Sequence, residues 1–280
     1  IKIPMFPFHT WLPDAHVEAP TPISVVLAGI LLKLGAYGML RINFPLAPDA
    51  FVEFSMVLAV LGVINIVYGA YVAMGQTDFK RLVAYSSVSH MGYFLLGAAA
   101  MFGLSGGTRD LSAGLPALTG AVLQLFTHGT SSGMLFLVVG VVYDRAHHRN
   151  LNDFGGLAQR MPYYTGLATV GIFASLGLPG MSGFISEALT LMGSYTQYPV
   201  LVIISTLGIL MTAAFLLYAL QRVFLGKLPD KYADFPDVNR VEVATMAPLA
   251  FLCIIVGILP TLVTDKMAAS LAAAVQTGHG

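Results

Sequence analysis

The chain is dominated by apolar segments that are each long enough to cross a lipid bilayer. Seven of them alternate with short polar connections, at residues 22–43, 51–74, 82–102, 117–143, 164–195, 199–224 and 243–263. A helix of about 20 apolar residues spans the hydrocarbon core of a membrane, which is about 30 Å thick. Because lipid offers the backbone no hydrogen-bonding partner, such segments fold as helices. The sequence therefore predicts an all-α, polytopic transmembrane helical bundle.

Charged residues are sparse and balanced. Of the 280 residues, 56% are hydrophobic and only 10% are charged, which is too few to cover a soluble globule of this size. The 14 basic and 14 acidic side chains cancel, so we expect no nucleic acid partner. A single cysteine, Cys253, excludes a disulfide framework. The carboxylate, cysteine and histidine residues lack the clustered spacing of a metal site.

Two of the membrane segments contain helix breakers. Segment 164–195 is interrupted at 177–183 by Gly-Leu-Pro-Gly-Met-Ser-Gly, where the proline removes a backbone donor and the glycines tolerate unwinding. The opening segment has a similar proline-rich interruption at 4–13, directly after Lys2. We predict two half-helices in segment 164–195, with an extended piece between them. Broken helices of this kind are typical of the centres of secondary transporters, since unwound backbone at membrane depth must line a protein cavity.

Two charged side chains lie deep inside apolar segments. Lys33 is roughly 11 residues, or about 16 Å, from each end of its segment, too far for its side chain to reach the membrane surface. A lysine at the bilayer centre costs about 2.5 to 3.5 kcal/mol, so we expect Lys33 to face a protein-lined ion pathway. Glu187 follows the second interruption. Its alternative interpretation is a carboxylate favoured by the dipole at a helix N-terminus.

Three histidines also fall within the membrane segments. His128 is surrounded by Gln, Thr and Ser side chains that can hold water, His90 follows a Ser-rich stretch, and His9 lies in the first interruption. Imidazole exchanges a proton near neutral pH, which makes these residues candidate members of a proton relay. The alternative is that each is only a hydrogen-bonding group between helices.

The basic residues of the connections are unevenly divided between the two ends of the predicted bundle. One end collects nine, namely Lys80, Arg81, Arg145, Arg149, Arg160, Arg222, Lys227, Lys231 and Arg240, whereas the other collects three, namely Arg41, Arg109 and Lys266. Connections rich in lysine and arginine stay on the cytoplasmic side of a membrane. We therefore expect the first end, called the basic side below, to face the cytoplasm or the mitochondrial matrix.

Four long motifs resemble one family of membrane proteins. They are KIPMFPFHTWLPDAHVEAPTP at 2–22, LAGILLKLGAYG at 27–38, TDFKRLVAYSSVSHMG at 77–92 and GLPGMSGFISE at 177–187. Together they make the chain similar to the antiporter-like membrane subunits of respiratory complex I, above all to the type called M in bacteria and subunit 4 in mitochondria. The resemblance extends over nearly the whole chain.

The resemblance implies a fold of 14 transmembrane helices built from two inverted five-helix repeats. The chain starts at Ile1 without an initiator methionine or a leader, and we expect it to be the C-terminal portion, with about eight helices in a single transmembrane domain. Residues 1–43 would end the first repeat, 51–226 would form the second, and 241–265 would form the final helix.

By position, Lys2 resembles the lysine at the break of the seventh helix, Lys33 the central lysine of the eighth and His128 the histidine of the eleventh. Glu187 resembles the ionisable residue of the broken twelfth helix. The resemblance implies proton translocation through this lysine, histidine and glutamate axis, driven by redox chemistry elsewhere in NADH:quinone oxidoreductase. His9 and His90 are further relay candidates.

The family resemblance also implies cofactors and partners. We expect no cofactor in this chain, with FMN, iron–sulfur clusters and quinone in other subunits. Its expected partners are the other membrane-arm subunits, including the sister antiporter-like chains, the lipid bilayer and protons. We expect an energy-transducing membrane, either the bacterial plasma membrane or the mitochondrial inner or thylakoid membrane.

Two alternative functions share the same pattern. One is a subunit of a multisubunit Na⁺/H⁺ antiporter or of an energy-converting hydrogenase, and the other is a purely structural element of the membrane arm. Glu187 favours the M type, because the sister chains and the antiporter relatives resemble one another in having lysine at that position.

Overall fold

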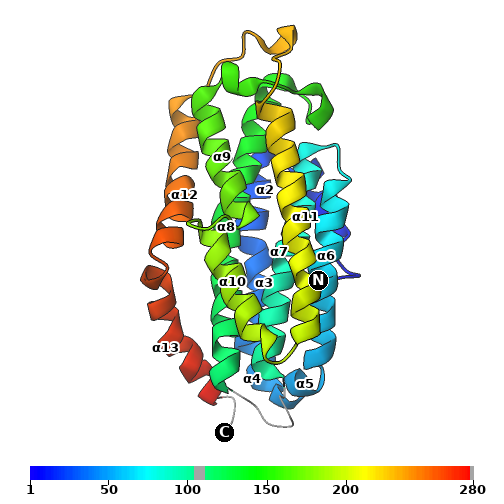
Figure 1. Ribbon diagram of the computed structural model, residues 1–280, viewed down its shortest axis with the longest axis vertical. Coiled ribbons are helices and arrows are strands. Elements are labelled where there is room, and N and C mark those ends of the chain that lie inside the picture. Colours follow the sequence, from blue (N-terminus) through cyan, green and yellow to red (C-terminus); the bar gives the residue numbers. More distant parts are fainter. Residues whose placement is uncertain (104–110, 278–280) are drawn as a thin grey trace.

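Five helical stretches among the described residues are long and apolar enough to cross a membrane, and they coincide with five of the seven predicted segments. They are Thr21–Leu46, Ser55–Met74 (α6), Gly114–Ala146 within α8 (Leu111–Ala146), Pro199–Phe224 (α11) and Arg240–Ile258 (α12). The structure, a computed structural model, describes residues 1–103 and 111–277. Its helices run alongside one another in an elongated bundle (Figure 1). The prediction of an all-α membrane-spanning bundle is confirmed.

The other two predicted segments carry more polar residues or are interrupted. Segment 82–102 belongs to α7 (Phe79–Phe102), which is buried along nearly its whole length, so its serines and His90 face other helices. Segment 164–195 forms α9 (Pro162–Leu176) and α10 (Ser182–Tyr195). Gly177 ends α9 with a φ of 73°, a left-handed conformation that glycine adopts without steric strain. The predicted pair of half-helices is therefore confirmed.

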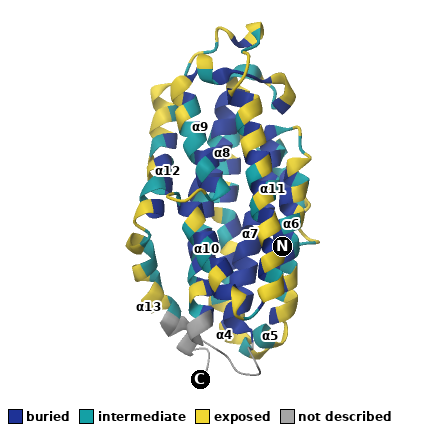
Figure 2. Ribbon diagram, viewed as in Figure 1, coloured by how far each residue is buried: buried dark blue, intermediate teal, exposed yellow. Residues whose placement is uncertain are grey.

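Helices α7 and α8 form the centre of the bundle (Figure 2). In the apolar stretch of α8, 78% of the residues are buried, against 33% in α11, whose outer face is exposed. Close packing of α6 on α7 depends on small residues. A Cβ atom at Gly92 would lie 2.5 Å from the carbonyl oxygen of Gly62. Small residues at such crossings let membrane helices approach closely, which is what places polar side chains of α7 within reach of their neighbours.

The N-terminal part begins outside any helix. Residues 1–10 are non-helical, as the prolines predict, and α1 (Trp11–Glu18) follows. Helices α2 (Thr21–Val26), α3 (Leu32–Gly38) and α4 (Phe44–Leu46) then form one continuous stretch, joined by π-helical turns at Leu27–Leu31 and Met39–Asn43. A short α5 (Pro48–Glu53) leads into α6.

Connections on the basic side are held by capping and by ion pairs. Asp78 caps α7, since its Oδ1 accepts hydrogen bonds from the backbone of Lys80 and Arg81 at 2.8 and 3.0 Å. Arg145 forms an ion pair of 2.8 Å with Glu242, the capping-box residue of α12. Three 3₁₀ turns complete these connections, at Leu151–Asp153 (η3), Leu157–Gln159 (η4) and Asp230–Tyr232 (η5).

The prediction of a final helix over 241–265 was wrong at its C-terminal end. Helix α12 stops at Ile258, and a separate helix, α13 (Thr261–Thr277), follows it. Pro260 is the cause, because its ring pushes the preceding residue out of the helical region, and Leu259 accordingly has a φ of −124°. Arg109, counted in the charge distribution, lies outside the described residues. The division into inverted repeats stays a prediction.

Candidate functional site

Lys33 contacts a histidine of the central helix. Its Nζ lies 2.7 Å from Nδ1 of His128 on α8 and also donates a hydrogen bond to the carbonyl oxygen of Ala28. Ala28 belongs to the π-helical turn Leu27–Leu31, and π-helical turns inside α-helices are frequent at functional sites. Glycines permit the approach, because a Cβ at Gly129 would lie 3.0 Å from the carbonyl oxygen of Gly29. The lysine thus has two partners inside the bundle.

His128 lies beside a second histidine. Its ring centroid is 5.5 Å from that of His90 on α7. With Nδ1 directed at Lys33, Nε2 of His128 is buried and finds no hydrogen-bond partner among the described residues. Buried polar nitrogens are normally satisfied by protein or by ordered water. Nε2 of His128 is therefore a candidate for a hydrogen bond to an ordered water molecule.

His90 joins the two halves of the broken helix. Its Nδ1 lies 3.0 Å from Oε1 of Glu187 on α10, and its Nε2 lies 3.1 Å from Oγ of Ser175 at the end of α9. The side chains of His90 and Glu187 are only 4% and 8% exposed. His90 is thus an inter-helix hydrogen-bonding group, and Glu187 is more than a carboxylate at a helix N-terminus, since it has a specific buried partner.

The polar residues around His128 bind α10. Ser186 donates a hydrogen bond to Oε1 of Gln124, and its Oγ lies 2.9 Å from Oγ1 of Thr127. All three residues are buried. These contacts fix α10 against α8 one residue before Glu187, and they hold the carboxylate near His90.

Two sequence-predicted residues lie away from these contacts. Lys2 is exposed and packs beside α3, where a Cβ at Gly35 would lie 2.6 Å from its own Cβ. His9 is buried, but its ring packs on Phe6 and Tyr68, with centroid distances of 5.8 and 5.2 Å. The structure therefore brings together Lys33, His128, His90 and Glu187, which we call the buried axis, and leaves Lys2 and His9 outside it.

Two further buried ionisable side chains, His16 and Lys80, were not predicted from the sequence as site residues. His16 on α1 is fully buried, stacks on Phe136 at 4.3 Å, and lies within electrostatic range of Lys33, Lys80 and His128. Lys80, counted above as a charge of an exposed connection, is 4% exposed and donates a hydrogen bond to the carbonyl oxygen of Ala19. The signal for Lys80 was its place two residues after the cap Asp78, inside the first turn of a buried helix.

A small pocket opens next to Lys80 on the basic side. It has a volume of about 160 Å³ and is also lined by Glu18, Thr21 and Arg149. Among the described residues no group of three histidine, cysteine or acidic side chains could hold a metal ion.

Ionisable side chains in direct or water-bridged contact can exchange protons. The buried axis alternates an amine, two imidazoles and a carboxylate, drawn from α3, α8, α7 and α10. Ionisable groups inside a membrane bundle mark ion pathways, and broken helices mark their centres. Fold and site together define a polytopic membrane protein that carries a line of ionisable side chains inside its helix bundle.

Within that class the sequence match is specific. Residues 1–212 match the family described as NADH:quinone oxidoreductase/Mrp antiporter, TM. The chain belongs to this family.

Curated relatives carry several kinds of name. The chain is 42% identical over 280 residues to NADH-quinone oxidoreductase subunit M of Rhodobacter capsulatus, covering 100% of the chain and 52% of that protein. It is 43% identical over 268 residues to F(420)H(2) dehydrogenase subunit M of Methanosarcina mazei, covering 95% of the chain and 51% of that protein. The chain thus spans about half the length of the curated relatives it matches.

Solved structures share the fold. A chain of respiratory complex I from Thermus thermophilus with bound NADH superposes with a TM-score of 0.88 at 31% identity, covering all of this chain and 56% of that one. A chain of the Mrp complex from Dietzia sp. superposes with a TM-score of 0.84 at 20% identity, covering 100% of this chain and 59% of that one. The second likeness concerns the fold alone.

Proposed function

We propose that this chain is part of an M-type, proton-translocating membrane subunit of NADH:quinone oxidoreductase, and that protons cross it along the buried axis. The names of the curated relatives support the assignment to the subunit. The observation that carries the proposal is the continuity of the axis. Lys33 touches His128 at 2.7 Å, the two histidine rings are 5.5 Å apart, and His90 touches Glu187 at 3.0 Å.

Each contact corresponds to one proton transfer in the proposed mechanism. The Lys33 ammonium gives a proton to Nδ1 of His128, which becomes an imidazolium and releases the proton on Nε2 to a bridging water. His90 takes up a proton on Nε2 beside Ser175 and releases the one on Nδ1 to Glu187. The carboxyl group then delivers the proton toward the side opposite the basic one. Moving one charge against 100 mV costs about 2.3 kcal/mol, which redox chemistry in other subunits must supply.

The polar pocket beside Lys80 is the proposed place of proton uptake. Lys80 lines this pocket together with Glu18, which shares α1 with the buried His16. Lys2 and His9 are proposed to serve the neighbouring half of the complete subunit, where Lys2 would pair with a glutamate of an upstream helix.

The redox cofactors and the membrane neighbours of this chain are proposed to come from the rest of the assembly. FMN, iron–sulfur clusters and quinone are proposed to belong to other subunits, with the sister antiporter-like chains as membrane neighbours. The chain is a multi-pass membrane protein, and we propose the bacterial plasma membrane as its location.

The test is NADH-driven proton translocation by the complete complex in proteoliposomes. Lys33→Ala and Glu187→Gln should each lower the number of protons moved per electron, because each removes one exchangeable group of the axis. Lys266→Ala and Glu53→Gln change exposed residues of the same types and serve as matched controls. Unchanged proton-to-electron ratios and rates in Lys33→Ala and Glu187→Gln would leave only a structural role for the axis.

A second candidate function is a subunit of a multisubunit Na⁺/H⁺ antiporter or of an energy-converting hydrogenase. The description of the matched family, which names the Mrp antiporter beside NADH:quinone oxidoreductase, favours the antiporter. Sodium-dependent proton exchange in vesicles without NADH or quinone would support this candidate and contradict the first.

A further inference from the structure

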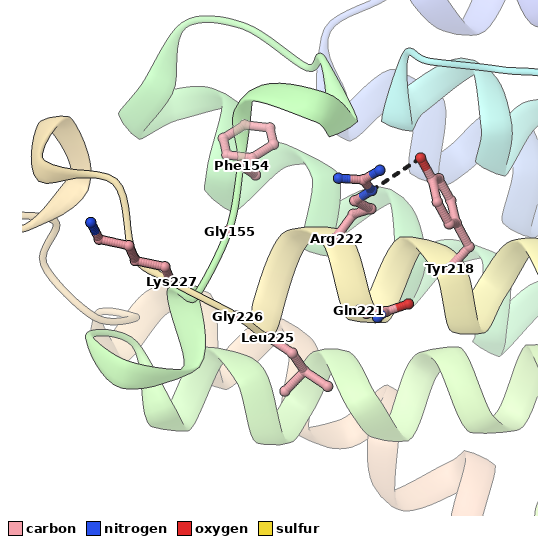
Figure 3. Close-up of a pocket in the computed structure, with 8 residues that line it drawn as sticks. All are labelled: Phe154, Gly155, Tyr218, Gln221, Arg222, Leu225, Gly226 and Lys227. Atoms are coloured by element: carbon pink, nitrogen blue, oxygen red, sulfur yellow. Dashed lines mark hydrogen bonds between the residues drawn. The ribbon is translucent and has the colours of Figure 1, made fainter.

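A basic pocket lies at the end of α11, away from the buried axis. Its volume is about 580 Å³, and it is formed by the last turns of α11, the segment that follows them, and the backbone around Phe154 (Figure 3). Tyr218, Gln221 and Arg222 line it from α11, and Lys227 lines it from the following segment. The pocket therefore offers two cations and two further polar side chains on the basic side of the bundle.

The cations of this pocket are available to an anion. No carboxylate lines the pocket in the part of the chain that the structure describes. Nε of Arg222 donates a hydrogen bond of 3.1 Å to the Tyr218 hydroxyl, and its guanidinium lies 5.3 Å from the centroid of that ring. The contact orients the guanidinium beside the helix, as Figure 3 shows, and its charge is not neutralised by the neutral phenol. A phosphate group is the anion whose geometry an oriented guanidinium fits best.

A separate apolar groove lies farther along α11. It has a volume of about 420 Å³ between α6 and α11, and it is lined by Val67 and Tyr71 of α6 and by Ile204 and Met211 of α11. Residues 204, 211 and 218 are spaced by seven, and 222 follows 204 by five full turns. The groove and the guanidinium therefore share one stripe of the helix.

The dimensions match one leaflet of a membrane. Met211 and Arg222 are 11 positions apart, which is roughly 16 Å along the helix axis. Half of a hydrocarbon core of about 30 Å is about 15 Å. An amphiphile with an anionic head at Arg222 would thus lay its chain in the groove at the depth where acyl chains lie.

We propose that this surface binds one anionic phospholipid, with its phosphate between Arg222 and Lys227 and an acyl chain in the groove at Met211. The charge selects the occupant, because basic pockets at the cytoplasmic ends of membrane helices attract anionic head groups. A zwitterionic lipid gains less from two cations, and free phosphate gains nothing from the groove. The proposal is independent of the function of the buried axis.

The test measures lipid retention by the full-length subunit after exchange into detergent. Protein reconstituted with equal amounts of phosphatidylglycerol and phosphatidylcholine is washed, and the lipids that stay bound are counted by mass spectrometry. Unmodified protein should retain phosphatidylglycerol in preference. The double variant Arg222→Gln/Lys227→Gln should bind it roughly thirtyfold more weakly, since two basic contacts to an anionic head group are lost. Lys231→Gln, an exposed lysine of the same side that does not line the pocket, is the matched control.

A second variant examines the groove. Ile204→Trp fills it without changing any charge, and it should also lower phosphatidylglycerol retention. Thermal unfolding establishes that each variant folds. Equal retention of the two lipids by unmodified protein, a double variant that matches Lys231→Gln, or complete displacement of the lipid by millimolar inorganic phosphate would each overturn the proposal.

Discussion

Glutamine substitutions at His90 and Glu187, made singly and together, measure the contact that connects α7 to the second half-helix. Nδ1 of His90 lies 3.0 Å from Oε1 of Glu187, and the side chains are 4% and 8% exposed. Glutamine keeps nearly the volume of glutamate and can still accept a hydrogen bond. The exchange therefore removes charge and proton exchange while leaving little cavity.

The expected coupling follows from this burial. A hydrogen bond that involves a charged group contributes about 1.5 to 3 kcal/mol, and the low exposure of this pair leaves little screening by water. We expect a coupling free energy of about 2 kcal/mol, so that the two single losses together exceed the loss of the double variant by that amount. Ser175, the other partner of His90, stays in place in all variants and cancels in the cycle.

The assay is unfolding of the full-length protein in mixed micelles by increasing SDS, followed by far-ultraviolet circular dichroism. A second cycle, between Glu187→Gln and His9→Gln, is the control. His9 is equally buried, but it packs on Phe6 and Tyr68 and shares no partner with Glu187. Its cycle should be additive within about 0.5 kcal/mol.

The coupling between His90 and Glu187 must exceed that of the control for the reasoning to hold. A value below about 0.5 kcal/mol would mean that the carboxylate and the imidazole do not interact in the folded protein. The continuity of the buried axis between α7 and α10 would then be lost, and with it the argument that protons reach Glu187 from His90.

Two further predictions concern the scaffold. Asp78→Ala removes the cap of α7 and the ion pair with Arg149, and it should lower the free energy of unfolding by about 1 to 2 kcal/mol in the same SDS titration. The control is Asp14→Ala, which breaks only an exposed ion pair. It should change the free energy of unfolding by less than about 0.5 kcal/mol. Gly92→Val should prevent close packing of α6 on α7, since even a Cβ would lie 2.5 Å from the Gly62 oxygen. We expect loss of the folded, monodisperse protein in size-exclusion chromatography. A stable Gly92→Val protein would contradict that packing.

Local chemistry made much of the fold predictable. A segment of more than twenty apolar residues has one stable arrangement in lipid, so the spans followed from the pattern. The break at 177–183 was predictable because proline and glycine act on the backbone at their own positions. The same rule, applied to Pro260, would have divided the last predicted helix, which ends at Ile258.

The free-energy cost of burying a charge in a membrane made some members of the site predictable from the sequence. Their contacts were not predictable. Lys33 and Glu187 were predicted as site residues because a charge in an apolar membrane segment needs a partner. Their partners come from α8 and α7, about 95 residues away in the chain. Lys80 was misjudged because its sequence position suggested an exposed connection, whereas it is buried and donates a hydrogen bond to Ala19, just after α1.

What the sequence alone determined is the number and place of the apolar segments, the interruptions, and the residues whose burial would be expensive. These depend on the chemistry of each residue and its near neighbours. Only the tertiary structure decided that His90 joins Ser175 to Glu187, that Lys33 meets His128, and that Lys2 and His9 stand apart. Such contacts depend on how helices cross, and crossings are set by glycines and side-chain volumes on several helices at once, which no single segment of sequence encodes.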